Sequence, residues 1–145
     1  MKLEEIENEW SKDSKIDKLS LDEESLKIPE LHNKYYKIYI REKIQLKKLK
    51  SDLDELIKLK KDYYDGRLSK EELNEYGWQP FNLTILKSEM DTYLNADVDL
   101  INKKLKCAAQ SEKVDFLHSI IDSVSKRTFV IKNAIEFLRF TNGGF

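Results

Sequence analysis

The stretch that decides the fold runs from Val114 to Leu138 and reads VDFLHSIIDSVSKRTFVIKNAIEFL. Its apolar residues recur every three or four positions, which is the spacing of one face of a long α-helix. The first stripe consists of Val114, Leu117, Ile121, Val124, Thr128, Ile131, Ile135 and Leu138. A second stripe beside it consists of Phe116, Ile120, Val130, Ala134 and Phe137.

So wide an apolar face indicates burial against several helices rather than against a single partner helix. Those helices can belong to the same chain, which makes this segment the central helix of a monomeric bundle. They can also belong to neighbouring copies, which makes the face a self-association surface. The pattern alone leaves both interpretations open.

A second long helix is predicted from Leu31 to Tyr64, because this stretch contains neither Gly nor Pro. Within it, leucines repeat with the heptad-like spacing of a coiled-coil seam at Leu46, Leu49, Leu53 and Leu56. Asp65-Gly66 predicts its end, with the glycine as a left-handed cap. Shorter helices are expected over residues 4–12, 70–75 and about 82–108, and a break can fall near residues 95–97.

Composition agrees with long helices. The chain has 145 residues, of which 37% are charged, with only 4 Gly and 2 Pro. So few turn formers argue against a β-sandwich or barrel, and the sequence predicts an all-α subunit built as a helical hairpin or coiled coil. One cysteine, Cys107, excludes an internal disulfide framework. No run approaches the length of a membrane span, so we expect no membrane partner.

The net charge of −1 hides four blocks of alternating sign. Residues 1–33 and 62–99 are acidic, whereas residues 34–61 carry 10 basic and 4 acidic side chains and residues 100–145 carry 8 and 4. Local potential rather than total charge steers a polyanion to a surface. The near-neutral total therefore does not exclude nucleic acid.

Basic and aromatic residues interleave at the end of the long helix predicted over residues 31–64. Lysines neutralise phosphates, and aromatic rings can stack on the bases of a single strand. The candidate DNA-binding residues are Arg41, Lys47, Lys48, Lys58, Lys60, Lys61, Tyr63, Tyr64 and Arg67. The alternative is a solvated coiled-coil face whose lysines pair with the acidic blocks and whose tyrosines pack in a helix–loop core. A scaffold protein without DNA affinity would look like this.

Motifs of catalysis are absent: the chain has no phosphate loop, dinucleotide fingerprint or nucleophile elbow. We therefore expect no enzyme activity, no cofactor and no metal. The one hydrolytic alternative is a nuclease that holds a divalent ion on Asp91, Asp97 and Asp99, whose polar setting favours solvated surface instead.

Four short stretches, in chain order, are MKLEE at 1–5, KDYYDGR at 61–67, KSEM at 87–90 and SKRTFVIK at 125–132. Together they resemble the UvsY-like recombination mediators of T-even-type phages. The similarity covers nearly the whole chain, with an apparent insertion around residues 68–82.

This resemblance implies a non-catalytic protein of phage DNA recombination, repair and replication, working in the cytoplasm of the infected bacterial host. Such a protein binds single-stranded DNA as a ring of six or seven copies. It helps to load a RecA-like phage recombinase onto strands covered by the phage single-strand-binding protein, and it contacts both proteins.

The resemblance also implies roles for particular segments. A basic motif before the tyrosine pair is implicated in DNA binding, and it falls here on Lys58 and Lys60, where the family has arginine at the second position. Residues 1–80 are then the DNA-binding part of a single helical domain, and residues 81–145 the oligomerisation part. The predicted interface residues are Val114, Leu117, Ile121, Val124, Ile131, Ile135 and Leu138.

Overall fold

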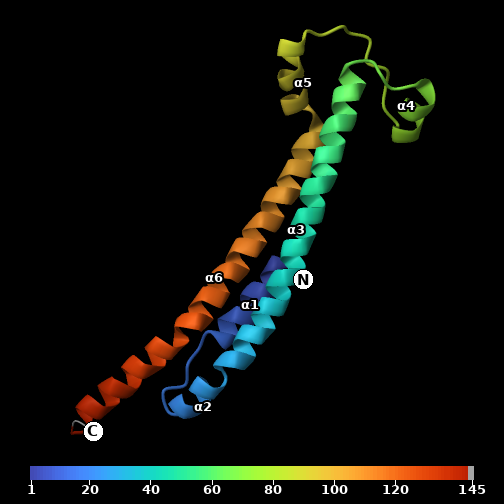
Figure 1. The fold of residues 1–145 in the computed structure, drawn as a ribbon. Helices are drawn as coiled ribbons and strands as arrows, with labels where there is room; N and C mark the ends of the chain where they lie inside the picture. The colour runs from blue at the N-terminus through green and yellow to red at the C-terminus, as the bar shows by residue number, and fades with distance from the viewer. Residues whose placement is uncertain (144–145) are drawn as a thin grey trace. The chain divides into compact units, whose positions relative to one another are not determined.

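A computed structural model describes residues 1–143 and contains six α-helices and one short 3-10 helix (Figure 1). The elements, in chain order, are α1 (Leu3–Asp13), α2 (Leu21–Leu26), α3 (Ile28–Tyr64), α4 (Lys70–Tyr76), η1 (Lys87–Glu89), α5 (Met90–Ala96) and α6 (Val98–Thr141). Residues 144 and 145, which belong to the predicted oligomerisation part, lie outside the described residues.

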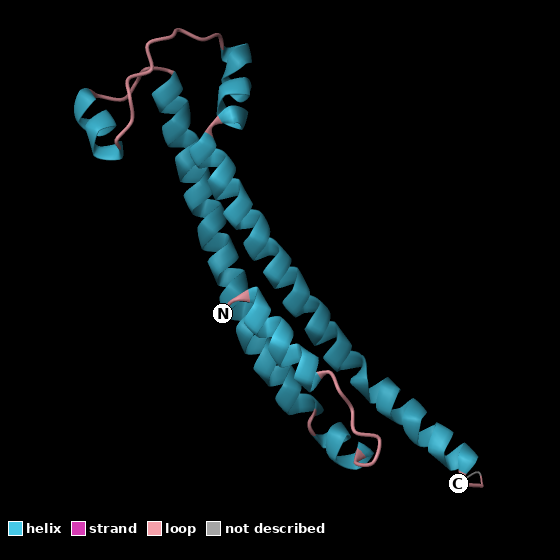
Figure 2. Ribbon diagram, turned by 180° about the vertical axis from the view of Figure 1, so that it is seen from behind, coloured by secondary structure: helices cyan, strands magenta, loops and turns pink. Residues whose placement is uncertain are grey.

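The prediction of an all-α fold is confirmed. Over residues 1–143 the chain forms helices and loops without a β-strand (Figure 2). None of the helices in this range is long and apolar enough to cross a bilayer.

Local sequence explains where the first long helix ends and the next begins. Helix α3 stops at Tyr64, and Gly66 follows with a φ of 73°, a left-handed conformation that glycine adopts without steric cost. Helix α4 starts with a capping box, in which the Glu72 backbone N–H donates to the Ser69 hydroxyl at 3.2 Å. Both features match the sequence prediction.

A break separates α5 from α6, as the sequence allowed. Asp97 takes an extended conformation, and its carboxylate accepts a hydrogen bond from the Leu100 backbone N–H at 3.0 Å. It thereby satisfies one of the free N–H groups at the start of α6. The prediction of helix from residue 82 is wrong, because helical structure resumes only at Lys87. The apolar stripe of residues 114–138 also does not lie on a helix of its own, because α6 runs unbroken from Val98 to Thr141.

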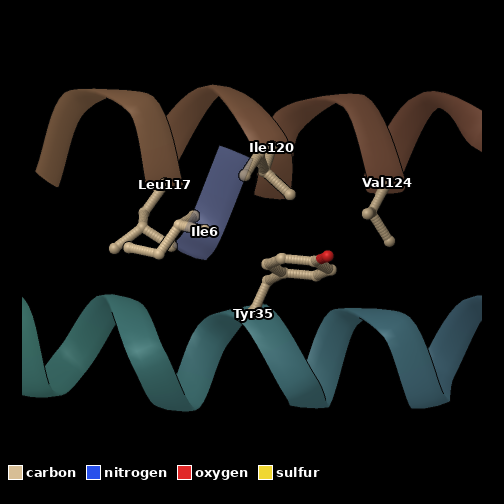
Figure 3. Close-up of a cluster of buried hydrophobic side chains, with 5 residues drawn as sticks. All are labelled: Ile6, Tyr35, Leu117, Ile120 and Val124. Atoms are coloured by element: carbon tan, nitrogen blue, oxygen red, sulfur yellow. The ribbon is translucent and has the colours of Figure 1, made fainter. Parts of the chain in front are cut away.

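The chain divides into two compact units. The first comprises residues 1–44 and 111–145, and its core consists of side chains from three helices (Figure 3). Ile6 of α1 and Tyr35 of α3 pack against Leu117, Ile120 and Val124, which lie on successive turns of α6. Each of these five side chains is at most 1% exposed. Much of the apolar stripe of residues 114–138 therefore packs into this core.

A buried arginine fastens the connection between α1 and α2 to α6 in this unit. The Arg127 guanidinium donates to the backbone carbonyls of Asp13 and Lys15, each at 3.0 Å, and pairs with the buried Glu24 carboxylate at 3.1 Å. An arginine can satisfy several acceptors at once because its donors form a planar fork.

The second unit comprises residues 45–110 and contains the end of α3, α4, α5 and the start of α6. Its buried apolar side chains are Leu46, Leu73, Leu94, Leu100 and Cys107. Ion pairs show that α3 and α6 run antiparallel here, because Asp52 pairs with Lys103 and the later Lys60 pairs with the earlier Asp99. The predicted helical hairpin is therefore present, whereas the division of roles at residue 80 and the ring stay predictions.

Candidate nucleic-acid interface

Six of the nine predicted DNA-binding residues present their side chains to solvent. These are Arg41 in the first unit and Lys47, Lys48, Lys58, Lys61 and Arg67 in the second. Within residues 1–143, neither Lys58 nor Lys61 forms an ion pair. Since these two residues are three positions apart on α3, they share a face. Their charges are therefore available to an external anion.

Lys60 differs sharply from its neighbours because it is only 4% exposed. Its Nζ lies 2.8 Å from Asp99 Oδ2, 3.1 Å from Asp97 Oδ2 and 3.9 Å from the centre of the Trp78 ring. An ammonium over an indole face is favourable, the more so when desolvated. Lys60 thus joins the end of α3 to the start of α6 and to the loop after α4.

The tyrosine pair forms part of the same network. The Tyr64 hydroxyl donates to Asp97 Oδ2 at 2.7 Å, and the Tyr63 hydroxyl donates to the backbone carbonyl of Gln79 at 2.6 Å. Both rings lie edge-on or tilted against Phe81 at 4.9–5.8 Å. Both side chains are half-buried, as the alternative of a helix–loop core required, and stacking on DNA bases stays a prediction for them.

Protonation in this network is fixed by its hydrogen bonds. Burial raises the pKa of the Tyr64 hydroxyl, and the hydrogen bond to Asp97 raises it further, so Tyr64 stays a neutral donor. Burial alone would raise the pKa of Asp97. Hydrogen bonds from Tyr64, the Leu100 N–H and Lys60 outweigh it and hold that pKa below its usual value. Asp97 is therefore ionised, and both of its carboxylate oxygens accept hydrogen bonds.

A surface hollow of about 490 Å³ gathers cations around the end of α3. Its lining residues are Lys61, Asp65, Arg67, Lys87, Met90 and Asp91. Lys87 was not predicted as a binding residue, because it is an isolated lysine in an acidic part of the sequence. The loop between α4 and η1 places it in the same hollow as Lys61. Three cations against two carboxylates leave the hollow positive.

The nuclease alternative finds no support in this geometry. Asp97 and Asp99 both pair with Lys60, whose single positive charge offsets one of their two negative charges and already serves both as a cationic partner. Across residues 1–143, no three His, Cys, Asp or Glu side chains are placed to hold a metal ion.

The predicted interface stripe on α6 has mixed exposure. Val114, Leu117, Val124 and Ile131 are buried within the first unit, Ile121 and Ile135 are half-buried, and Leu138 is 40% exposed. The four buried residues are therefore part of the hydrophobic core of the subunit. The large apolar side chains that remain exposed near the end of α6 are Phe129, Val130, Phe137, Leu138 and Phe140.

Comparison with known proteins gives one consistent result. Residues 9–144 match the family model described as "Recombination, repair and ssDNA binding protein UvsY". The chain is 27% identical to the recombination protein uvsY of Enterobacteria phage T4 over 143 residues, which is 99% of each protein.

Solved structures agree with the sequence comparison. Two crystal structures of the bacteriophage T4 recombination mediator protein UvsY, in lattice types II and IV, each superpose with a TM-score of 0.83. Their sequence identities to this chain are 26% and 25%, and the matches cover 99% and 97% of this chain and 99% of each of theirs.

Proposed function

Since the chain belongs to the UvsY family of recombination, repair and single-stranded-DNA-binding proteins, we propose that it loads a RecA-like phage recombinase onto strands covered by single-strand-binding protein. It does so without catalysis, in the cytoplasm of the infected bacterial host, and contacts both proteins. The observation that carries the DNA-binding part is the exposed, unpaired charge of Lys58 and Lys61 on one face of α3.

Within this site the residues divide by exposure. Arg41, Lys47, Lys48, Lys58, Lys61 and Arg67 are exposed and supply phosphate contacts. Lys60, Tyr63 and Tyr64 belong to the same site but are tied into the network around Asp97. They hold the end of α3 and the following loop in the shape that the exposed cations need.

A ring of six or seven copies, formed through the C-terminal helix, multiplies this modest basic face. Linked weak sites bind a long ligand far more tightly than one site alone. The exposed phenylalanines of α6 support the association, because apolar surface of this kind is a frequent mark of protein–protein contact. Strand binding by the ring then competes with single-strand-binding protein and presents DNA to the recombinase.

The DNA site is tested with the double variant Lys58→Ala/Lys61→Ala and a labelled oligothymidine strand at two salt concentrations. Affinity should fall, and its salt dependence should flatten by about 0.7 in log–log slope for each phosphate that the variant no longer neutralises. The matched control is Lys15→Ala/Lys18→Ala, which removes two exposed lysines of the acidic N-terminal block. Unchanged affinity and slope in the first variant would refute the site.

The loading step needs its own assay. Filament assembly by the recombinase is followed on a strand first saturated with single-strand-binding protein, with and without this protein. The proposal expects assembly to accelerate when the protein is added. A protein that binds the strand but leaves assembly unchanged would refute loading and leave DNA binding standing.

The second candidate is a coiled-coil scaffold without DNA affinity. It is favoured by the pairing of Lys60 with Asp97 and Asp99, since that lysine is neutralised inside the fold. Absence of strand binding by the wild-type protein at physiological salt would decide for the scaffold.

A further inference from the structure

A run of largely exposed aromatic rings lies along the first part of α3, in the first unit. His32 stacks on Tyr36 with ring centres 5.4 Å apart and planes 16° apart, and Tyr36 lies 6.1 Å from Tyr39. His118 of α6 extends the run at 6.0 Å from Tyr39. These four residues are called the aromatic series below.

Apart from Tyr39, which is half-buried and packs against the core, the series lies outside the core that the neighbouring tyrosine fills. Tyr35 is 0% exposed and points into the core (Figure 3), and its hydroxyl donates to Asp13. Tyr36 is the next residue on the helix, about 100° further round, and is 44% exposed. His32 and His118 are exposed as well. The series therefore has ring surface to offer that the subunit does not use.

The surroundings of the series are mostly cationic on α3, whereas on α6 the exposed Asp115 and Asp122 flank His118, and Asp122 pairs with Lys126. In the part of α3 up to residue 44, Lys37, Arg41 and Lys43 are exposed. The acidic residues of that part are Glu30, which is exposed, and Glu42, which is buried and paired with Lys113 and the N-terminal amine. Lys43 Nζ lies 5.4 Å from the centre of the Tyr39 ring, so a cation sits directly beside the aromatic surface.

Resting on the proposed function, we infer that the aromatic series is a second contact for single-stranded DNA, on which unpaired bases stack while Lys43 meets a phosphate. Exposed rings beside cations suit a single strand, because every base has a π-face and stacking tolerates any sequence. A subunit interface would use the rings without needing the cations. The exposed cations of α3 around Tyr36 and Tyr39 therefore favour a polyanion at this end of the series.

The test compares Tyr36→Leu with two controls in the full-length protein, using labelled oligothymidine. Tyr36→Phe keeps the ring, and Ile40→Ala trims an exposed apolar residue one turn further along. Loss of one stacked base should weaken binding by Tyr36→Leu about fivefold or more. The salt slope should stay unchanged because the variant keeps every lysine and arginine. Both controls should bind within about twofold of wild type.

A second variant reports contact directly. Tyr36→Trp keeps a large ring, so it should bind the strand normally, and its added tryptophan emission should be quenched by the strand. The background from Trp10 and Trp78 is removed by subtracting the wild-type signal. Normal binding without any quenching of the added emission would count against stacking at this position.

The outcomes separate this inference from the proposed function. If the wild-type protein binds the strand and Tyr36→Leu binds it equally tightly, this inference is overturned and the proposed function stands. So would a weaker affinity that comes with smaller particles in sedimentation, because the series would then be a contact between copies. A wild-type protein that binds no strand would overturn the proposed function first.

Discussion

Lys60 shows how much one residue's setting decides its role. Its spacing in a lysine-rich helix predicts a phosphate contact, and its neighbours Lys58 and Lys61 are exposed as that prediction requires. Yet Lys60 is enclosed by Asp99, which is thirty-nine residues further along the chain, together with Asp97 and Trp78. Helical periodicity does not reveal which lysine faces such a distant partner, so the sequence could not separate it from its neighbours.

Replacing Lys60 should therefore cost stability. Lys60→Gln leaves the buried Asp97 without its cation, and breaking such a pair typically costs about 3 kcal/mol. Urea denaturation measures the effect on the free energy of unfolding. Lys60→Arg, which keeps the charge, should recover most of it. A Lys60→Gln protein of normal stability that no longer binds the strand would contradict this role and make Lys60 a direct DNA contact.

Asp97 should make stability depend on acid. Its pKa is lowered in the folded state from the ordinary value of 3.8. The carboxylate therefore stabilises the fold fully above that value, and the contribution is lost as pH falls through the lowered pKa. Asp97→Asn should be less stable at neutral pH and should lose less stability between pH 5 and pH 2. Parallel stability curves for the two proteins over that range would contradict the argument.

At the level of elements, breaks and caps were predictable because their signals are local. Gly66 and the Ser69–Glu72 capping box stand where residue types indicated, and the break before α6 falls where the sequence allowed one, near residues 95–97. Helix α2 was not predicted, because six residues in a polar stretch carry no periodic pattern. It is held instead by Arg127, through a hydrogen bond to a residue 103 positions away in the chain.

Arg127 therefore offers a test of this element. Arg127→Gln should destabilise the first unit by about 3 kcal/mol, since Glu24 and two backbone carbonyls are left without a buried partner. It should also open residues 14–20 to proteolysis. The neighbouring Lys126→Gln removes an exposed pair with Asp122 and should have little effect. Equal protease resistance in the two variants would contradict the role of Arg127 in holding residues 14–20 and α2.

At the scale of the whole molecule, the apolar pattern of α6 left two interpretations open. The structure shows that the first stripe is largely buried inside the subunit and that another set of apolar side chains stays exposed, so self-association stays a prediction for that exposed set. The sequence could not assign them, because a wide stripe looks the same whether its partner is an intramolecular helix or another copy.

Association through α6 predicts different effects for the two sets. Phe137→Asp changes a side chain that is 65% exposed, so it should lower the particle mass in sedimentation while the thermal midpoint stays near that of wild type. Ser125→Asp places the same charge at an exposed position about 120° round the helix from Phe137 and should leave the mass unchanged. Val124→Asp should unfold the subunit, because that side chain is fully buried. Wild-type particles of monomer mass would contradict the ring.

The most direct test of the central claim is a titration of the wild-type protein with a labelled oligothymidine strand over a series of salt concentrations. If the exposed cations of α3 bind the phosphate backbone, affinity is high at low salt, and its logarithm falls linearly with the logarithm of the salt concentration. Failure to bind at low salt, or binding that salt leaves unchanged, would contradict the account.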